Sequence, residues 1–250
     1  MWKDRNVLFR IIRKSRSIEA ARMHNKRPIV SFTFDDFPHS AVINGANILE
    51  RYGARGTFYI AGSYCGRVVD GVTQYRPEDL QILSRAGHEI GCHTFNHPRV
   101  STLTTSGLIE EIELNATFIA HHLPTVVMRT FAYPFGDISP EATQVLRQQF
   151  SGCRGIQFGL NRKTADLGQL RAVQLYNRTI NSDLIFKLIQ KARAPYSWLI
   201  FYTHDVDDRP SKFGCSPALF EHAVKTAVSS DLQILSVSDA ISRVVSNGGT

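Results

Sequence analysis

Two adjacent carboxylates, Asp35 and Asp36, directly follow an apolar segment at residues 29–34. Neighbouring carboxylates repel each other and resist removal from water, so a compensating cation or donor is expected beside them. An isolated Asp-Asp pair is more often a helix cap or a solvated turn. The pair therefore points to chemistry only in combination with other residues of the chain.

Two histidines, His93 and His97, are four residues apart and follow the strand-like segment 88–92. On one turn of a helix, positions i and i+4 lie on the same face, which would bring both imidazoles within reach of one ion. Two imidazoles and one carboxylate form a three-ligand set that leaves coordination positions open for water and substrate. A lone His-x-x-x-His is more often structural, but here a carboxylate follows another apolar segment.

The elements that must position these residues alternate between strand-like and helix-like segments. We predict strands at 29–34, 56–60, 88–92, 126–132, 152–157, 172–176, 198–202 and 233–237, and helices at 40–52, 76–87, 104–122, 140–149, 181–193, 217–229 and 238–246. Such alternation favours a parallel sheet covered by helices. About seven or eight strands predict an α/β fold of the distorted (β/α) barrel type.

Polar residues of four strands fall where each predicted strand ends. Asp35 and Asp36 follow the first strand, His93 the third, Pro134 the fourth, and His204 follows the strand at 198–202. In barrels of parallel strands, functional residues gather at the carboxyl ends of the strands. We therefore expect these side chains to meet at one edge of the sheet.

The segments Thr33-Phe-Asp-Asp36 and His93-Thr-Phe-Asn-His97-Pro98 resemble the first two motifs of the polysaccharide deacetylases, the NodB-homology enzymes of carbohydrate esterase family 4. The resemblance implies that Asp36, His93 and His97 bind one divalent metal ion, usually zinc and sometimes cobalt or nickel. It also implies that Asp35 is the general base that activates the attacking water. The family fold is a distorted (β/α) barrel, as the strand count predicts.

The segment Phe131-Ala-Tyr-Pro-Phe-Gly136 is similar to the third family motif. The resemblance implies that the backbone amide of Phe135 stabilises the oxyanion of the reaction. Ala132 stands where the family usually has an arginine that orients the base. Arg171 is the candidate that replaces this arginine.

The segment Phe201-Tyr-Thr-His204-Asp205 resembles the fifth family motif, which implies that His204 is the general acid. The alternative is a barrel histidine that is hydrogen-bonded to a carboxylate. Asp205 either tunes His204 or stabilises its own loop. The resemblance covers about residues 28–245, and the fourth motif is not recognisable.

The function implied is a metal-dependent hydrolase that removes N-acetyl groups from the amino sugars of a poly- or oligosaccharide or a glycolipid. One alternative is a deformylase or another amide hydrolase acting on a lipid-linked sugar. Another is an inactive barrel that only binds glycans. Against that last reading, the chain keeps the full set of motif residues, namely Asp35, Asp36, His93, His97 and His204.

Composition bounds the remaining possibilities. The chain has 250 residues with 43% hydrophobic side chains and a net charge of +7, which suits one catalytic domain at 28–250 preceded by a basic arm at 1–27. This arm is expected to form a short amphipathic helix that either packs on the domain or contacts an anionic membrane surface. Neither a secretory signal nor a membrane-spanning segment is recognisable, so a cytoplasmic location is expected.

The positive charge favours an anionic or lipid-phosphate-linked glycan as substrate, whereas nucleic acid is not an expected partner. Aromatic residues near the strand ends are candidates for stacking on sugar rings or for packing of the barrel lid: Phe37, Tyr64, Phe95, Tyr133, Phe135 and Phe213.

Overall fold

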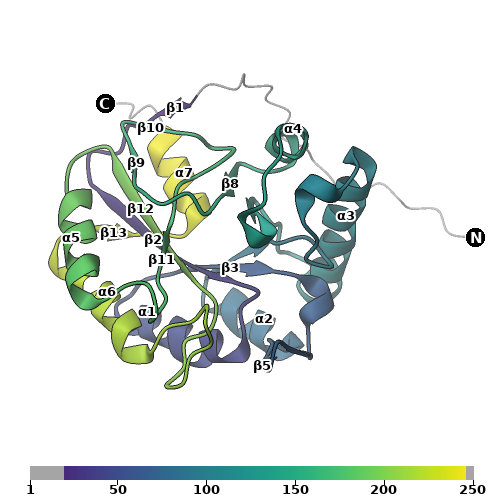
Figure 1. The fold of residues 1–250 in the computed structure, drawn as a ribbon, viewed down its shortest axis with the longest axis horizontal. Coiled ribbons are helices and arrows are strands. Elements are labelled where there is room, and N and C mark those ends of the chain that lie inside the picture. The colour runs from purple at the N-terminus through teal and green to yellow at the C-terminus, as the bar shows by residue number, and fades with distance from the viewer. Residues whose placement is uncertain (1–19, 246–250) are drawn as a thin grey trace, which may run out of the picture.

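A curled, mostly parallel sheet forms the centre of the molecule in the computed structural model, which describes residues 20–245 (Figure 1). Seven strands run parallel in the order β11 (Val173–Gln174), β12 (Ser197–Thr203), β2 (Ile29–Asp35), β3 (Thr57–Ile60), β6 (Glu89–Cys92), β7 (Thr130–Ala132) and β8 (Gly152–Arg154). A parallel bridge between Arg154 and Leu170 connects β8 to the segment before β11. The strands therefore follow most of the circumference of a barrel, and the predicted distorted (β/α) barrel is confirmed.

The strands are β1 (Ala21–Arg22), β2 (Ile29–Asp35), β3 (Thr57–Ile60), β4 (Val68–Val69), β5 (Val72–Thr73), β6 (Glu89–Cys92), β7 (Thr130–Ala132), β8 (Gly152–Arg154), β9 (Asn161–Arg162), β10 (Thr164–Ala165), β11 (Val173–Gln174), β12 (Ser197–Thr203) and β13 (Gln233–Ile234). The α-helices are α1 (Asn47–Arg51), α2 (Pro77–Arg85), α3 (Thr105–His122), α4 (Pro140–Gln149), α5 (Ser182–Ala192), α6 (Pro217–Ser229) and α7 (Val237–Val245).

The two longest strands, β2 and β12, lie side by side at the middle of the sheet, and every residue in them is buried. Strands that are covered on both faces are apolar throughout rather than alternating, because helices pack on one face and the barrel interior fills the other. Figure 1 shows α5, α6, α1, α2 and α3 arranged around the outside of the curled sheet.

The register of β2 and β12 decides where the reactive residues lie. Trp198 is paired with Ile29 and Thr203 with Phe34, so the two strands end together. Asp35 and His204 consequently emerge at the same edge of the sheet. On the other side of β2, Asp35 pairs with Tyr59 of β3, and β3 pairs with β6, which ends one residue before His93.

The predicted elements correspond closely to those observed, with differences at some ends. The strand predicted at 126–132 begins only at Thr130. The helix predicted at 40–52 starts as a π-helix at Ala41–Ala46 before α1. Among residues 20–245, no helix is long and apolar enough to cross a membrane.

The basic arm predicted at 1–27 lies mostly outside the described residues, which begin at residue 20. Within the described part of the arm, β1 pairs antiparallel with β10 at the edge of the sheet. The division into an arm and a catalytic domain stays a prediction, and so does a membrane contact of the arm.

Candidate active site

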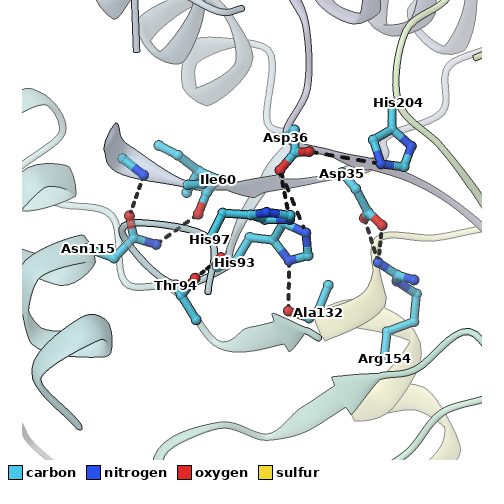
Figure 2. A network of polar contacts seen from close by, with 12 residues as sticks. Asp35, Asp36, Ile60, His93, Thr94, His97, Asn115, Ala132, Arg154 and His204 are labelled. Atoms are coloured by element: carbon cyan, nitrogen blue, oxygen red, sulfur yellow. Dashed lines mark hydrogen bonds and ion pairs between the residues drawn. The ribbon is translucent and has the colours of Figure 1, made fainter. Parts of the chain in front are cut away.

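Asp36, His93 and His97 come together at the carboxyl edge of the sheet, as the sequence predicts (Figure 2). One carboxylate oxygen of Asp36, Oδ1, lies 3.7 Å from Nε2 of His93 and 3.5 Å from Nε2 of His97. This buried oxygen has no hydrogen-bond partner within the described residues. Three potential ligand atoms at this spacing, too far apart for good hydrogen bonds, suit an ion bound at ~2.0–2.2 Å from each of them.

The backbone fixes the orientation of the His93 ring. Its Nδ1 lies 2.8 Å from the carbonyl oxygen of Ala132, at the end of β7. A carbonyl oxygen can only accept, so Nδ1 must carry the proton, which leaves Nε2 with a free lone pair directed toward Asp36. Metal-binding histidines are commonly held in this way by a partner on the other ring nitrogen.

Burial keeps both histidines neutral at neutral pH. It lowers the pKa of His93 to about 4 and, together with the neighbouring His93 and His204, lowers the pKa of His97 to about 2. Burial also raises the pKa of Asp36 well above its usual value, and the carboxylate of Asp35 adds to this effect. A cation bound here would relieve the cost of ionising Asp36, because an opposite charge favours the carboxylate.

The two histidines are not on a helix, contrary to our prediction. Residues 93–97 form a loop in which Thr94 and His97 have positive φ angles of 64° and 57°. Non-glycine residues in this conformation are uncommon and are held there by their surroundings. The two rings approach each other through this turn, with their centroids 4.9 Å apart.

Glu111 of α3 holds this loop, a role that no motif of the sequence indicated. Its Oε2 accepts hydrogen bonds from the backbone amides of Phe95 and Asn96, at 2.9 and 2.7 Å. Its Oε1 accepts a further bond from the side-chain amide of Asn96 at 2.8 Å. The helix therefore positions the segment that carries His97.

Asp35 has a different partner from Asp36. Nη2 of Arg154, at the end of β8, donates to both carboxylate oxygens of Asp35 at 2.5 Å (Figure 2). The Arg154 side chain is fully buried, and its guanidinium lies over the rings of Tyr59 and Tyr202, 5.4 and 4.8 Å from their centroids. Burial raises the pKa of Asp35, but the charge of Arg154 and its hydrogen bonds to the carboxylate contribute most to lowering it, and the net shift is downward, so Asp35 is ionised at neutral pH.

The prediction that Arg171 replaces the missing arginine of the third motif was wrong. Arg171 is exposed, its Nη1 is 3.5 Å from the carbonyl oxygen of Phe158, and its backbone amide donates to Asn161. Arg154 contacts Asp35 instead. The strand predicted at 152–157 places Arg154 inside the strand, whereas β8 ends at Arg154. With that boundary, the rule that identified Asp35 and His93 would also have identified Arg154.

His204 approaches Asp36 from a different side, as Figure 2 shows. Its Nε2 lies 4.0 Å from Oδ2 of Asp36, and its buried Nδ1 has no hydrogen-bond partner among residues 20–245. Asp205 is buried, and its carboxylate accepts from the backbone amide and hydroxyl of Ser211. Asp205 therefore stabilises the loop that follows β12, the second of the two roles predicted for it.

Three of the candidate aromatic residues lie beside the site. Phe135, with a positive φ of 58°, places its ring 4.5 Å from that of His97, and Tyr64 lies 5.5 Å from the same imidazole. The ring centroid of Phe213 lies 5.3 Å from that of His204. Two other candidates, Phe37 and Tyr133, are buried in the core. The roles of the Phe135 amide and of His204 in a reaction stay predictions.

Comparisons with known proteins agree with this arrangement. The family model described as polysaccharide deacetylase matches residues 22–149, slightly more than half of the chain. That match includes the metal-binding candidates and Phe135, but it ends before Arg154 and His204. Among curated relatives, chitin deacetylase 1 of Cryptococcus neoformans is 31% identical over 116 residues, which are 46% of this chain and 23% of the relative. The match thus spans about a quarter of that protein.

Solved structures share the fold at low sequence identity. An acetyl xylan esterase of family 4 from Clostridium thermocellum, in complex with a cobalt ion, has a TM-score of 0.61 at 17% identity, over 86% of this chain and 90% of its own. A carbohydrate esterase family 4 pseudoenzyme from Bacillus anthracis has a TM-score of 0.59 at 13% identity, over 89% of this chain and 68% of its own. The fold therefore occurs in both an esterase and a pseudoenzyme, and the family match identifies this chain as a member of the polysaccharide deacetylase family.

Proposed function

We propose that this chain is a metal-dependent hydrolase that removes N-acetyl groups from the amino sugars of a glycan or glycolipid. The observation that carries the proposal is the separation of two adjacent carboxylates into different environments. Asp36 lies beside two neutral imidazoles, and Asp35 is paired with a buried arginine. One carboxylate is thus available to a metal ion while its neighbour stays free to accept a proton.

The chemistry of the donor set fits zinc, which binds readily to two imidazoles and one carboxylate. Asp36, His93 and His97 would hold the ion, and cobalt and nickel are the alternatives. When bound, such an ion acts as a Lewis acid toward the acyl carbonyl and makes a water molecule acidic enough to lose a proton near neutral pH.

Asp35 is the general base in this proposal. It is ionised at neutral pH, and Arg154 fixes the direction of its carboxylate. General bases contribute ~10²–10⁴-fold when they are held within hydrogen-bond reach of the proton that they remove. Arg154 acts through Asp35, as a positioning residue.

His204 is the general acid that protonates the departing amine. Burial lowers its pKa, so its imidazolium is a stronger acid than that of an ordinary histidine. The Phe135 amide, in the turn beside His97, would stabilise the oxyanion, and a single donor of this kind contributes ~2.7–4 kcal/mol.

The substrate class is extended from the relatives, whose names include chitin and peptidoglycan deacetylases. The first test is the release of acetate or formate from a panel of N-acylated glycans, with metal-stripped and metal-restored protein compared side by side. We expect acetate only from the metal-restored protein. Release of formate instead of acetate would indicate that the chain is a deformylase with the same fold.

Metal content distinguishes the remaining outcomes. One bound ion per chain, lost in His97→Ala, is expected. Stoichiometric metal binding without release of either acid from any glycan would contradict the proposed reaction and favour an inactive glycan-binding barrel. A chain that binds no divalent metal would contradict the whole proposal.

A further inference from the structure

Two aromatic rings flank the site, each against a different histidine. The ring of Phe135 lies 4.5 Å from His97, and the ring of Phe213 lies 5.3 Å from His204. These histidines approach Asp36 from different sides (Figure 2). Phe135 is 54% exposed although it is a large apolar residue, so about half of its surface is accessible to a ligand. A glycan chain whose middle sugar lies at Asp36 would therefore extend over one ring in each direction.

Each of the two rings also carries cationic side chains. The guanidinium of Arg99 lies 4.6 Å from the centroid of Phe135. The guanidinium of Arg178 and the ammonium of Lys212 lie 5.3 and 4.9 Å from the centroid of Phe213. A cation over an aromatic face is attracted by the ring, which holds these flexible side chains near the site instead of leaving them extended into solvent.

None of these three cations forms a close ion pair in the part of the chain that the structure describes. Within residues 20–245, no ion pair within 4.0 Å joins Arg99, Arg178 or Lys212 to a carboxylate. Acidic residues of the same loops are engaged elsewhere: the Asp137 carboxylate accepts from the Ser101 amide, and Asp205 is bound to Ser211. Arg99 also interacts electrostatically with Asp137, but none of the three cations is held at ion-pair distance by a carboxylate of the described residues, so each can contact an anionic ligand.

We propose that the site takes an anionic glycan, with carboxylate or phosphate groups on the sugars either side of the N-acetylated residue. This inference rests on the proposed function. Arg99 would contact the anion of the sugar that stacks on Phe135, and Arg178 and Lys212 would contact the anion of the sugar that stacks on Phe213. Charge of one sign around a binding site also raises the local concentration of an oppositely charged substrate.

The experiment compares three N-acetylglucosamine hexasaccharide probes that differ in charge. One is the neutral homopolymer, one alternates N-acetylglucosamine with glucuronic acid, and one is linked through phosphodiesters. Acetate release by the metal-restored chain gives kcat/KM for each probe. Calorimetric binding to the metal-stripped chain gives an affinity that requires no turnover, so the inference is tested even if the chemistry fails.

The decisive variant replaces the three flanking cations by glutamine, as Arg99→Gln, Arg178→Gln and Lys212→Gln together. Its matched control removes the same charge from exposed positions in α5 and just after it. The control substitutions are Lys187→Gln, Lys191→Gln and Arg193→Gln. Because α5 leads into the start of β12 and His204 follows the end of that strand, the control residues lie toward the opposite edge of the sheet. The control therefore reports the effect of net charge alone.

We expect at least one anionic probe to bind more tightly than the neutral probe, with a difference that shrinks as salt screens the charges. An exposed ion pair alters affinity by roughly two- to five-fold, so the triple variant should lose about ten-fold or more for that probe. The probe that loses affinity identifies carboxylate or phosphate as the anion. Equal binding of all three probes, or an equal loss in the α5 control, would overturn the inference. Acetate release from the neutral probe would still support the proposed function in that case.

Discussion

Arg154 and Asp35 are 119 residues apart in the sequence, yet one guanidinium nitrogen donates to both oxygens of the carboxylate. Arg154 is at the end of β8 and Asp35 at the end of β2, so the pair spans the interior of the curled sheet. The Arg154 side chain is fully buried, and only 6% of the Asp35 side chain is exposed. The pair therefore fixes the orientation of the proposed base. It also makes the stability of the fold depend on both charges, because either one alone would be buried without a partner.

Replacing Arg154 by glutamine should reduce both stability and activity. Removing one partner of a buried ion pair leaves an uncompensated charge, which costs ~3–5 kcal/mol of unfolding free energy. The loss of the fixed carboxylate should lower kcat by up to about 10²-fold, the effect that a displacement of a reactive group by ~1 Å can have. Urea unfolding and acetate release measure the two effects.

Arg171→Gln is the matched control, since Arg171 is exposed and hydrogen-bonds only to backbone near Phe158 with its side chain. It should change unfolding free energy by no more than ~0.5 kcal/mol, as surface substitutions usually do. A larger loss of activity in Arg171→Gln than in Arg154→Gln would reverse the assignment made from the structure.

The stability gap between the unmodified chain and Arg154→Gln should depend on pH. In the folded chain the pKa of Asp35 lies below its usual 3.8, since the nearby cations outweigh burial. A lowered folded pKa contributes stability that is complete above the unfolded value and is lost as the pH falls through the folded value. In the variant, the buried Asp35 has lost the arginine, so its pKa is raised. Protonation of Asp35 in acid therefore removes the cost of burying an unpaired carboxylate. The gap in unfolding free energy should be widest near pH 7 and shrink toward pH 3, and a gap that widens in acid would contradict the pairing.

Asp35→Asn should abolish turnover and leave the metal bound. The substitution removes the proposed base, at a loss of ~10²–10⁴-fold, but touches none of the three metal-binding candidates. It also leaves the buried Arg154 charge without a partner, so the chain should lose stability. The double variant Asp35→Asn with Arg154→Met removes both charges and should regain stability without activity. Metal content by plasma emission spectroscopy and unfolding in urea separate these effects, and loss of metal in Asp35→Asn would make Asp35 a ligand.

The sequence predicted the fold and the metal-binding candidates because both depend on local patterns. Apolar strands that end in polar residues identified Asp36, His93 and His204 at one edge, and the register of β2 against β12 agrees with that expectation. The family match at residues 22–149 covers the same motifs.

Arg154 escaped prediction because its partner is distant in the sequence. Strand β8 has only three residues, Gly152–Arg154, and an arginine at the end of such a short strand cannot be distinguished from a surface residue by its local sequence. The turn that joins His93 to His97 escaped for a related reason. A spacing of four residues suits a helix, but positive φ angles at Thr94 and His97 are imposed by tertiary contacts that the local pattern does not contain.

Glu111→Ala should weaken metal binding although Glu111 is not itself a predicted ligand. Its carboxylate accepts the amide hydrogens of Phe95 and Asn96, and without it the loop that presents His97 loses three hydrogen bonds. Residues that orient metal ligands typically contribute ~10–100-fold in affinity, so the dissociation constant for zinc should rise within that range. The neighbouring Glu110→Ala removes the same charge from an exposed position of the same helix and should leave the constant unchanged. If both variants weakened zinc binding equally, the loss would come from the removal of a negative charge near the site. The loop contacts of Glu111 would then have no role in positioning His97.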